Sequence, residues 1–127
     1  MKTIALLFTF LTGVAFAELK PNTDWKATKE QGGIAQEVEL NLKKTVVGSS
    51  FDIVVDWQPG TTVEVTAKIT RSTADRIEFT FEDNFGNSGK GVITSKGKSV
   101  EIDFDTTTVA EPRGARQLGA YTLKQSK

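Results

Sequence analysis

Apolar side chains occupy alternate positions through three successive runs in the middle of this chain. Residues 51–57, 63–69 and 77–81 each alternate Phe, Ile, Val, Ala or Trp with mostly Asp, Glu, Thr or Lys. A period of two is typical of a strand with one face on a core and the other in water. Gln58-Pro59-Gly60 and residues 72–75 separate the runs and have the composition of tight turns. The pattern therefore predicts three antiparallel strands joined in sequence.

The same alternation predicts five more strands on either side of these three. They cover residues 24–29, 34–42, 91–94, 99–107 and 117–125, with turns or loops at 31–33, 48–50, 83–89, 95–98 and 110–116 and no helix. The fold class is thus all-β, an eight-stranded antiparallel up-and-down meander. Closure into a small barrel would leave no exposed sheet edge, and a two-sheet β-sandwich is the alternative.

The first 17 residues have a different pattern, that of a secretory signal peptide. Lys2 precedes an apolar run over 4–14, and Ala15 and Ala17 stand at the third and first positions before a predicted cleavage at Glu18. The run is too short for a comfortable membrane span. We expect an exported protein, with residues 1–17 as the signal and 18–127 as one domain that does not span a membrane.

The amino-acid composition limits which cellular compartment and which classes of partner are expected. The chain has no cysteine, so disulfides, thiolate metal sites and thiol nucleophiles are excluded, and an exported domain of this kind is more natural in a bacterial periplasm or secretome. Lys2 is one of sixteen basic residues and residues 1–17 hold no acidic one, which leaves fifteen basic against sixteen acidic residues in 18–127. This balance argues against nucleic acid or anionic lipid as a partner.

The chain has few residues that could carry catalysis or bind a metal or an anion. The chain has no histidine, the usual acid–base group and metal ligand at neutral pH, so we expect a non-enzymatic protein without cofactor or metal. The segment that begins at Asp83 fails the calcium-loop pattern, because Phe85 stands at its third position and Thr94 at its twelfth. Gly86, Gly89 and Gly91 resemble a phosphate loop only superficially, since no helix follows them.

An exported eight-stranded meander with Trp25 on its first strand and Arg113 and Arg116 before its last resembles the calycin superfamily of lipocalin-like and avidin-like barrels. The lipocalin pattern has glycine where this chain has Thr23. The resemblance implies that Trp25 plugs the closed end, that Arg113 or Arg116 packs across its indole, and that a ligand cavity opens at the other end. Phenylalanines at inward positions allow a filled interior equally well.

Two functions follow as hypotheses. The first is a lipocalin-like barrel that binds a small apolar or amphipathic ligand in its interior. The second is a structural or inhibitor-like interaction protein with a filled core, which binds a protein partner through the loops around Phe85 and 112–116. Gln36, a polar residue on an apolar face, would bond either a ligand or a polar neighbour. The residues expected to line or plug the interior are Trp25, Gln36, Trp57, Phe79 and Tyr121.

Overall fold

The computed structural model describes residues 19–31, 34–57 and 60–126. The predicted signal peptide and the turn positions 32–33 and 58–59 lie outside these residues. The elements are β1 (Thr23–Gln31), β2 (Ile34–Leu42), β3 (Ser50–Trp57), β4 (Thr61–Ser72), β5 (Arg76–Asp83), β6 (Ser88–Lys96), β7 (Ser99–Thr108), α1 (Pro112–Ala115) and β8 (Ala120–Ser126).

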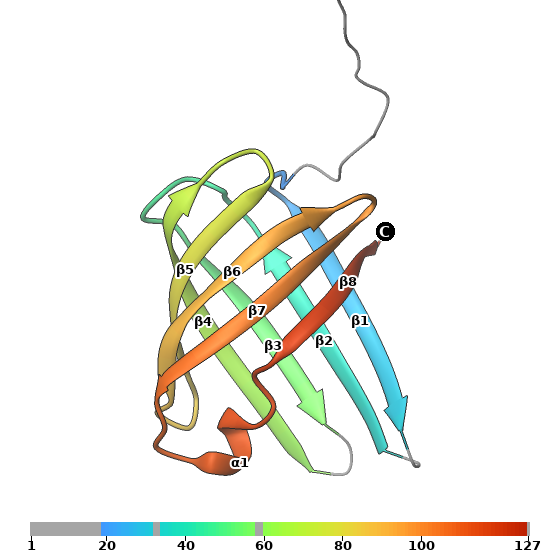
Figure 1. Ribbon diagram of the computed structural model, residues 1–127, viewed down its shortest axis with the longest axis vertical. Coiled ribbons are helices and arrows are strands. Elements are labelled where there is room, and N and C mark those ends of the chain that lie inside the picture. Colours follow the sequence, from blue (N-terminus) through green and yellow to red (C-terminus); the bar gives the residue numbers. More distant parts are fainter. Residues whose placement is uncertain (1–18, 32–33, 58–59, 127) are drawn as a thin grey trace, which may run out of the picture.

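The eight strands pair antiparallel in chain order, and β1 also pairs with β8, so the sheet is a closed barrel (Figure 1). The predicted meander is confirmed, and the sandwich alternative is wrong. Several strands extend beyond their predicted bounds. β4 spans twelve residues instead of 63–69, and β6 spans nine residues instead of a short segment around 91–94. β8 begins at Ala120 instead of Gln117. The single helical turn α1 was not expected; Pro112 occupies its start, where the missing N–H of proline costs nothing.

Alternation along the strands places the apolar side chains inside. Trp25, Leu40, Ile53 and Val65 are consecutive register partners on four neighbouring strands, and all four are buried. The polar residues between them lie on the outer face. Full burial of an aliphatic or aromatic side chain contributes about 1.5–3 kcal/mol, so this core can stabilise a domain without disulfides.

Four phenylalanines fill one side of the interior. Phe79 makes edge contacts with Phe51 and Phe104, at ring-centroid distances of 5.2 and 5.9 Å, and Phe81 makes one with Phe104 at 5.3 Å. Gly91 lies in register between Phe79 and Phe104, and a Cβ there would come within 2.4 Å of the Phe79 ring. The glycine therefore leaves the space that the Phe79 ring occupies.

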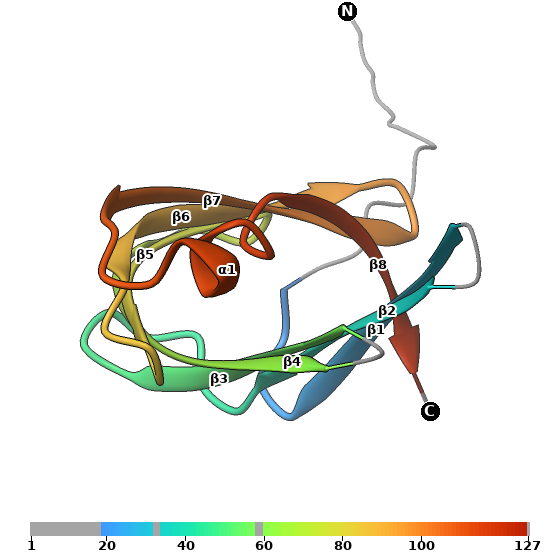
Figure 2. The same ribbon diagram turned by 90° about the horizontal axis from the view of Figure 1, so that it is seen from below.

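Each end of the barrel is covered by a different segment. Leu19 is buried at the end where β1 begins, and its N–H donates to the carbonyl of Ala74 at 3.1 Å. At the other end, the connection from β7 to β8 carries α1 across the opening, so that α1 lies against β4 (Figure 2). Leu118 of the same connection is buried. The described interior is thus filled along its length and covered at both ends.

Candidate functional site

The five residues expected in the interior fall into two groups. Trp25 and Phe79 are each 1% exposed and belong to the core. Gln36, Trp57 and Tyr121 are half-buried and belong to the end that α1 covers. Gln36 and Trp57 are register partners on β2 and β3, and Gln36 also bonds Tyr121. The structure therefore brings three of the five together.

Trp25 does not have the environment that the calycin resemblance implies. Its indole N–H donates to the hydroxyl of Thr23 at 3.0 Å. Arg113 pairs instead with Glu111, with Nε 2.8 Å from Oε1, and its side chain is 76% exposed. Arg116 is also exposed. Arg113 lies in α1 and Arg116 directly after it, at the end of the barrel away from the start of β1 (Figure 1), so the expected stacking on Trp25 is wrong.

Gln36, Gln117 and Tyr121 form a polar cluster under the β7–β8 connection. The Gln36 amide nitrogen donates to the Tyr121 hydroxyl and to Oε1 of Gln117, both at 2.8 Å. The Tyr121 hydroxyl donates in turn to the backbone carbonyl of Gln117. Each donor hydrogen of the Gln36 amide thus has an acceptor, as half-buried polar groups require. Gln36 pairs with polar neighbours, which was one of its two expected roles.

The cluster lies where the barrel closes least tightly. Among the described residues, β1 pairs with β8 through Asp24 with Ser126, Trp25 with Gln125 and Lys26 with Lys124. Tyr121 lies beyond this ladder and pairs only with β7. Its side chain instead reaches Gln36 on β2, two strands away. Hydrogen bonds between side chains therefore link the sheet at the end where the β1–β8 backbone pairs stop.

Burial raises the pKa of Tyr121 above its ordinary value of 10.0, and the hydrogen bond from Gln36 partly opposes this shift. The direction follows because a phenolate loses more hydration than a phenol on burial. Tyr121 is therefore a neutral phenol at physiological pH. In that state it acts as one donor and one acceptor, which suits positioning or recognition and not proton transfer.

A second polar network holds the β7–β8 connection in place. The Asn87 side chain is fully buried, and its Oδ1 accepts from the N–H groups of Ala110 and Glu111 at 2.7 and 2.9 Å. Its Nδ2 donates to the carbonyl of Glu111 and to the carboxylate of Asp83. The other Asp83 oxygen accepts from the backbone N–H groups of Phe85 and Asn87. The β5–β6 loop thus fixes the start of the connection.

Sequence reasoning missed Asn87 and Gln117. The segment 83–89 was interpreted as a turn-rich loop, and the turn composition around Asp83 does signal side-chain bonds to nearby backbone. The contact with Glu111 spans 24 residues, so no local signal predicts it. Phe85 is half-buried under α1, where Gly114 lies so close that a Cβ would come within 2.7 Å of its ring. Phe85 therefore supports α1.

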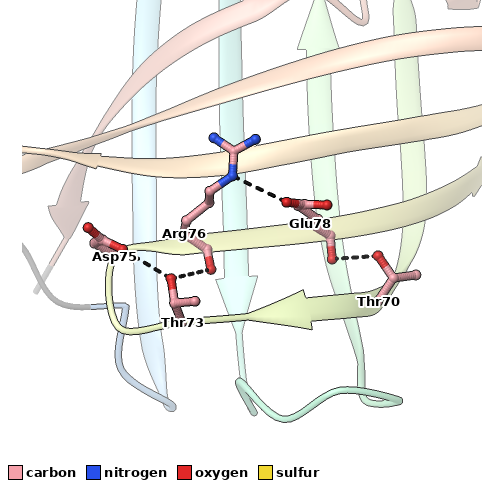
Figure 3. A network of polar contacts seen from close by, with 5 residues as sticks. All are labelled: Thr70, Thr73, Asp75, Arg76 and Glu78. Carbon is pink, nitrogen blue, oxygen red and sulfur yellow. Dashed lines mark hydrogen bonds and ion pairs between the residues drawn. The ribbon is translucent and has the colours of Figure 1, made fainter.

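The described hollows of the molecule open on the outer face of the sheet. One of about 350 Å³ lies over β5, β6 and β7, and its lining includes Thr70, Arg76 and Glu78. Figure 3 labels these three lining residues: Arg76 bonds Glu78 at 3.3 Å, and Thr70 donates to the Glu78 carbonyl. Two others, of about 500 and 310 Å³, lie outside β3–β7 and β1–β3. The Arg76 charge is already paired with Glu78, and both side chains of this ion pair are solvent-accessible.

In the ranges that the structure describes, no three His, Cys, Asp or Glu side chains come together as a metal site. No helix in those ranges has the length and apolar character needed to cross a bilayer. Comparison with family models, with curated proteins and with solved structures gives no match for this chain. The likeness to calycins consequently rests on the closed eight-stranded antiparallel barrel alone.

Proposed function

We propose that this chain is an exported, non-enzymatic interaction protein whose filled barrel presents the β7–β8 connection to a protein partner. The observation that carries the proposal is the bracing of this connection. It runs from residue 109 to 119, long for a link between adjacent antiparallel strands. The buried Asn87 holds its start, and the cluster around Tyr121 holds its end. A loop fixed in one shape loses little entropy on binding, which favours affinity.

The exposed side chains of the β7–β8 connection suit contact with a partner protein. Val109 is 53% exposed, Pro112 is exposed, and Arg113 projects beside them with its guanidinium on Glu111. This hydrogen bond lowers the pKa of Glu111 below 4.5 and raises that of Arg113, so both are charged at neutral pH. Arginine with an apolar neighbour is the kind of group that interfaces use as an anchor. A partner with a carboxylate beside an apolar patch would match it.

The test compares capture of exported proteins from the source cell by the wild type and by two variants. Arg113→Glu with Val109→Ser should reduce recovery of a partner at least about tenfold, since anchor residues dominate interface energy. Lys90→Glu, on the outer face of β6, is the charge-matched control and should recover the wild-type amount. Equal recovery by all three proteins, with unchanged thermal unfolding, would exclude the connection as the binding surface.

A second candidate function is binding of a small amphipathic ligand at the Gln36–Tyr121 cluster. It is favoured by the position of this cluster, beyond the last β1–β8 pair and beside the half-buried Trp57. A ligand there would replace the Gln117 contacts with its own polar group and lie along Trp57. This is the lipocalin-like hypothesis, restricted to the covered end because the rest of the described interior is filled.

Fluorescence distinguishes this candidate from the first. Titration with anilinonaphthalene sulfonate should quench Trp57 by energy transfer, and Trp57→Phe should remove most of the quenching because Trp25 lies in the core near the start of β1. Gln36→Leu should weaken binding of the probe. If wild-type emission does not change at any probe concentration, the cluster serves only to close the barrel.

A further inference from the structure

The end of the barrel opposite α1 carries a concentration of exposed positive charge. It consists of the lead-in to β1, the 43–49 loop, the 73–75 turn and the 97–98 turn, which Figure 1 shows together at one end. We call it the loop end. Its exposed basic side chains are Lys20, Lys43, Lys44, Arg71, Lys96 and Lys98. Asp24, Asp52 and Asp75 are carboxylates at this end of the described chain, since Asn41 pairs with both Asp24 and Asp52, and Asp75 accepts a bond from Thr73 (Figure 3). Glu78 is the register partner of Arg71.

The ion pairs between described residues join Lys26 to Glu39, Arg76 to Glu78 and Arg113 to Glu111, and none involves these six side chains. Carboxylates gather instead at the α1 end and include Asp56, Glu82, Asp83 and Glu111. The fold thus separates a nearly neutral chain into a basic end and an end with more acidic groups.

Two adjacent apolar side chains project from the same loop end. Val46 is 64% exposed and Val47 is 59% exposed, directly after Lys43-Lys44-Thr45. The loop that carries them is tied down: the Gly48 N–H donates to the Ile69 carbonyl at 2.8 Å, and the Ser49 N–H donates to the Val46 carbonyl at 3.0 Å. Because the backbone is held at these points, the valines do not turn inward. Two adjacent exposed valines beside lysines offer apolar contact and positive charge on the same surface.

We propose that the loop end docks on an anionic lipid surface, with Val46 and Val47 at the boundary between headgroups and acyl chains and the lysines on lipid phosphates. Juxtamembrane lysines and arginines are attracted by the negative potential of such a surface. The separation of charge would also orient the molecule, since the acidic α1 end is repelled. The proposal does not rest on the proposed function, although the two are compatible because docking would leave the β7–β8 connection facing away from the lipid.

The valines favour lipid over a soluble polyanion. A polysaccharide or nucleic acid would gain from the lysines but not from two exposed aliphatic side chains. Near neutrality of the whole chain argued against anionic lipid, yet that argument averages over the surface. Interactions between exposed charges are screened over roughly 8 Å at physiological ionic strength. The local charge of one end therefore matters more than the total.

Vesicle flotation tests the proposal with the exported form of the chain, because the apolar run at 4–14 would itself bind lipid. The wild type should bind phosphatidylcholine vesicles only when they contain phosphatidylglycerol, and added salt should weaken binding. Lys43→Glu with Lys44→Glu should weaken it about tenfold or more. Val46→Ser with Val47→Ser should weaken it at least about threefold while the salt dependence remains. Lys90→Glu with Arg116→Glu, an equal charge change away from the loop end, should bind as the wild type does.

Several results would overturn the proposal. They are the absence of wild-type binding to phosphatidylglycerol vesicles, equal binding to phosphatidylcholine alone, and a loss in the Lys90/Arg116 control as large as in the Lys43/Lys44 variant. Heparin binding that depends on the lysines, with vesicle binding insensitive to the valines, would assign the loop end to a soluble polyanion instead. Unchanged thermal unfolding of each variant would show that the loss is local.

Discussion

At the scale of single residues, Gly91 is fixed by its neighbours and not by a turn. Its missing side chain leaves room for the Phe79 ring, and an added Cβ would also lie 2.8 Å from the Asp103 carbonyl oxygen. The Asp103 backbone and the buried Phe79 ring cannot both move to make room for a Cβ at this position. A glycine in a strand that other atoms approach this closely has a packing role. The phosphate-loop resemblance of this segment is therefore accidental.

We predict that Gly91→Ala destabilises the protein by about 1–3 kcal/mol, the usual cost of overpacking a core. Chemical denaturation followed by circular dichroism measures the change. Gly119→Ala is the control, because nothing lies within 4 Å of a Cβ at that position. Equal stability of the two variants would mean that Phe79 repacks freely.

Tyr121 gives a prediction on pH dependence. Its titration can be followed by absorbance without interference from other tyrosines, because it is the only tyrosine in the chain. Its pKa is raised above 10.0 by burial. The phenol form is thus favoured in the folded state, and its contribution to stability is complete below the unfolded pKa and is lost as pH rises through the folded one. The phenolate absorbance should titrate above the value of free tyrosine, and stability should fall over that range.

Gln36→Leu is the informative variant for this titration. It removes the hydrogen bond that favours the phenolate, so the Tyr121 pKa should rise further. Circular dichroism at each pH verifies that the barrel is still folded. A midpoint at the free-tyrosine value in the folded protein would contradict the burial of this hydroxyl.

At the scale of elements, Asn87 joins two loops that sequence places far apart. Asn87→Ala leaves the part-buried N–H groups of Ala110 and Glu111 without their acceptor, and an unsatisfied buried group costs at most roughly 1–3 kcal/mol. We expect faster amide exchange at these two residues and a lower unfolding midpoint. Asn84→Ala, at an exposed position of the same loop, should have the smaller effect. The reverse order would mean that the connection is held by α1 and Phe85 alone.

The strands themselves could be predicted because each carries its own signal. All eight expected segments fall on observed strands, since alternation reports directly which side chains leave water. The helical turn α1 was missed because four residues are too few for a periodic signal. The start of β8 was placed three residues early for a related reason. Gln117 is compatible with a strand by residue type, but its side chain accepts a hydrogen bond from Gln36 within the connection.

At the scale of the whole molecule, one apolar core runs through all eight strands, and the small β1–β8 ladder completes the ring. A domain of this size with a single core should unfold in one step. We predict coincident transitions for far-ultraviolet circular dichroism and for tryptophan emission in Trp25→Phe and Trp57→Phe, which report the two ends separately. An earlier transition at Trp57 would mean that the α1 end opens on its own.

The candidate site was only partly accessible to sequence reasoning. Gln36 and Tyr121 were identified individually, Gln36 as a polar residue on an apolar face and Tyr121 by the alternation of the last strand. Their contact with each other and with Gln117 depends on how the barrel closes, which no local pattern specifies. The interior expected as a ligand cavity is, where described, filled by its own side chains.

By itself, the sequence determined the fold class, the order of the strands and the apolar face that each strand buries, because a period of two is a local property of each strand. Only the tertiary structure decided the closure of the ring, the bracing of the β7–β8 connection and the separation of basic from acidic residues. These depend on distances between residues far apart in the chain. A near-zero total charge is the sum of the residues, whereas the field that a partner meets depends on where the fold places them.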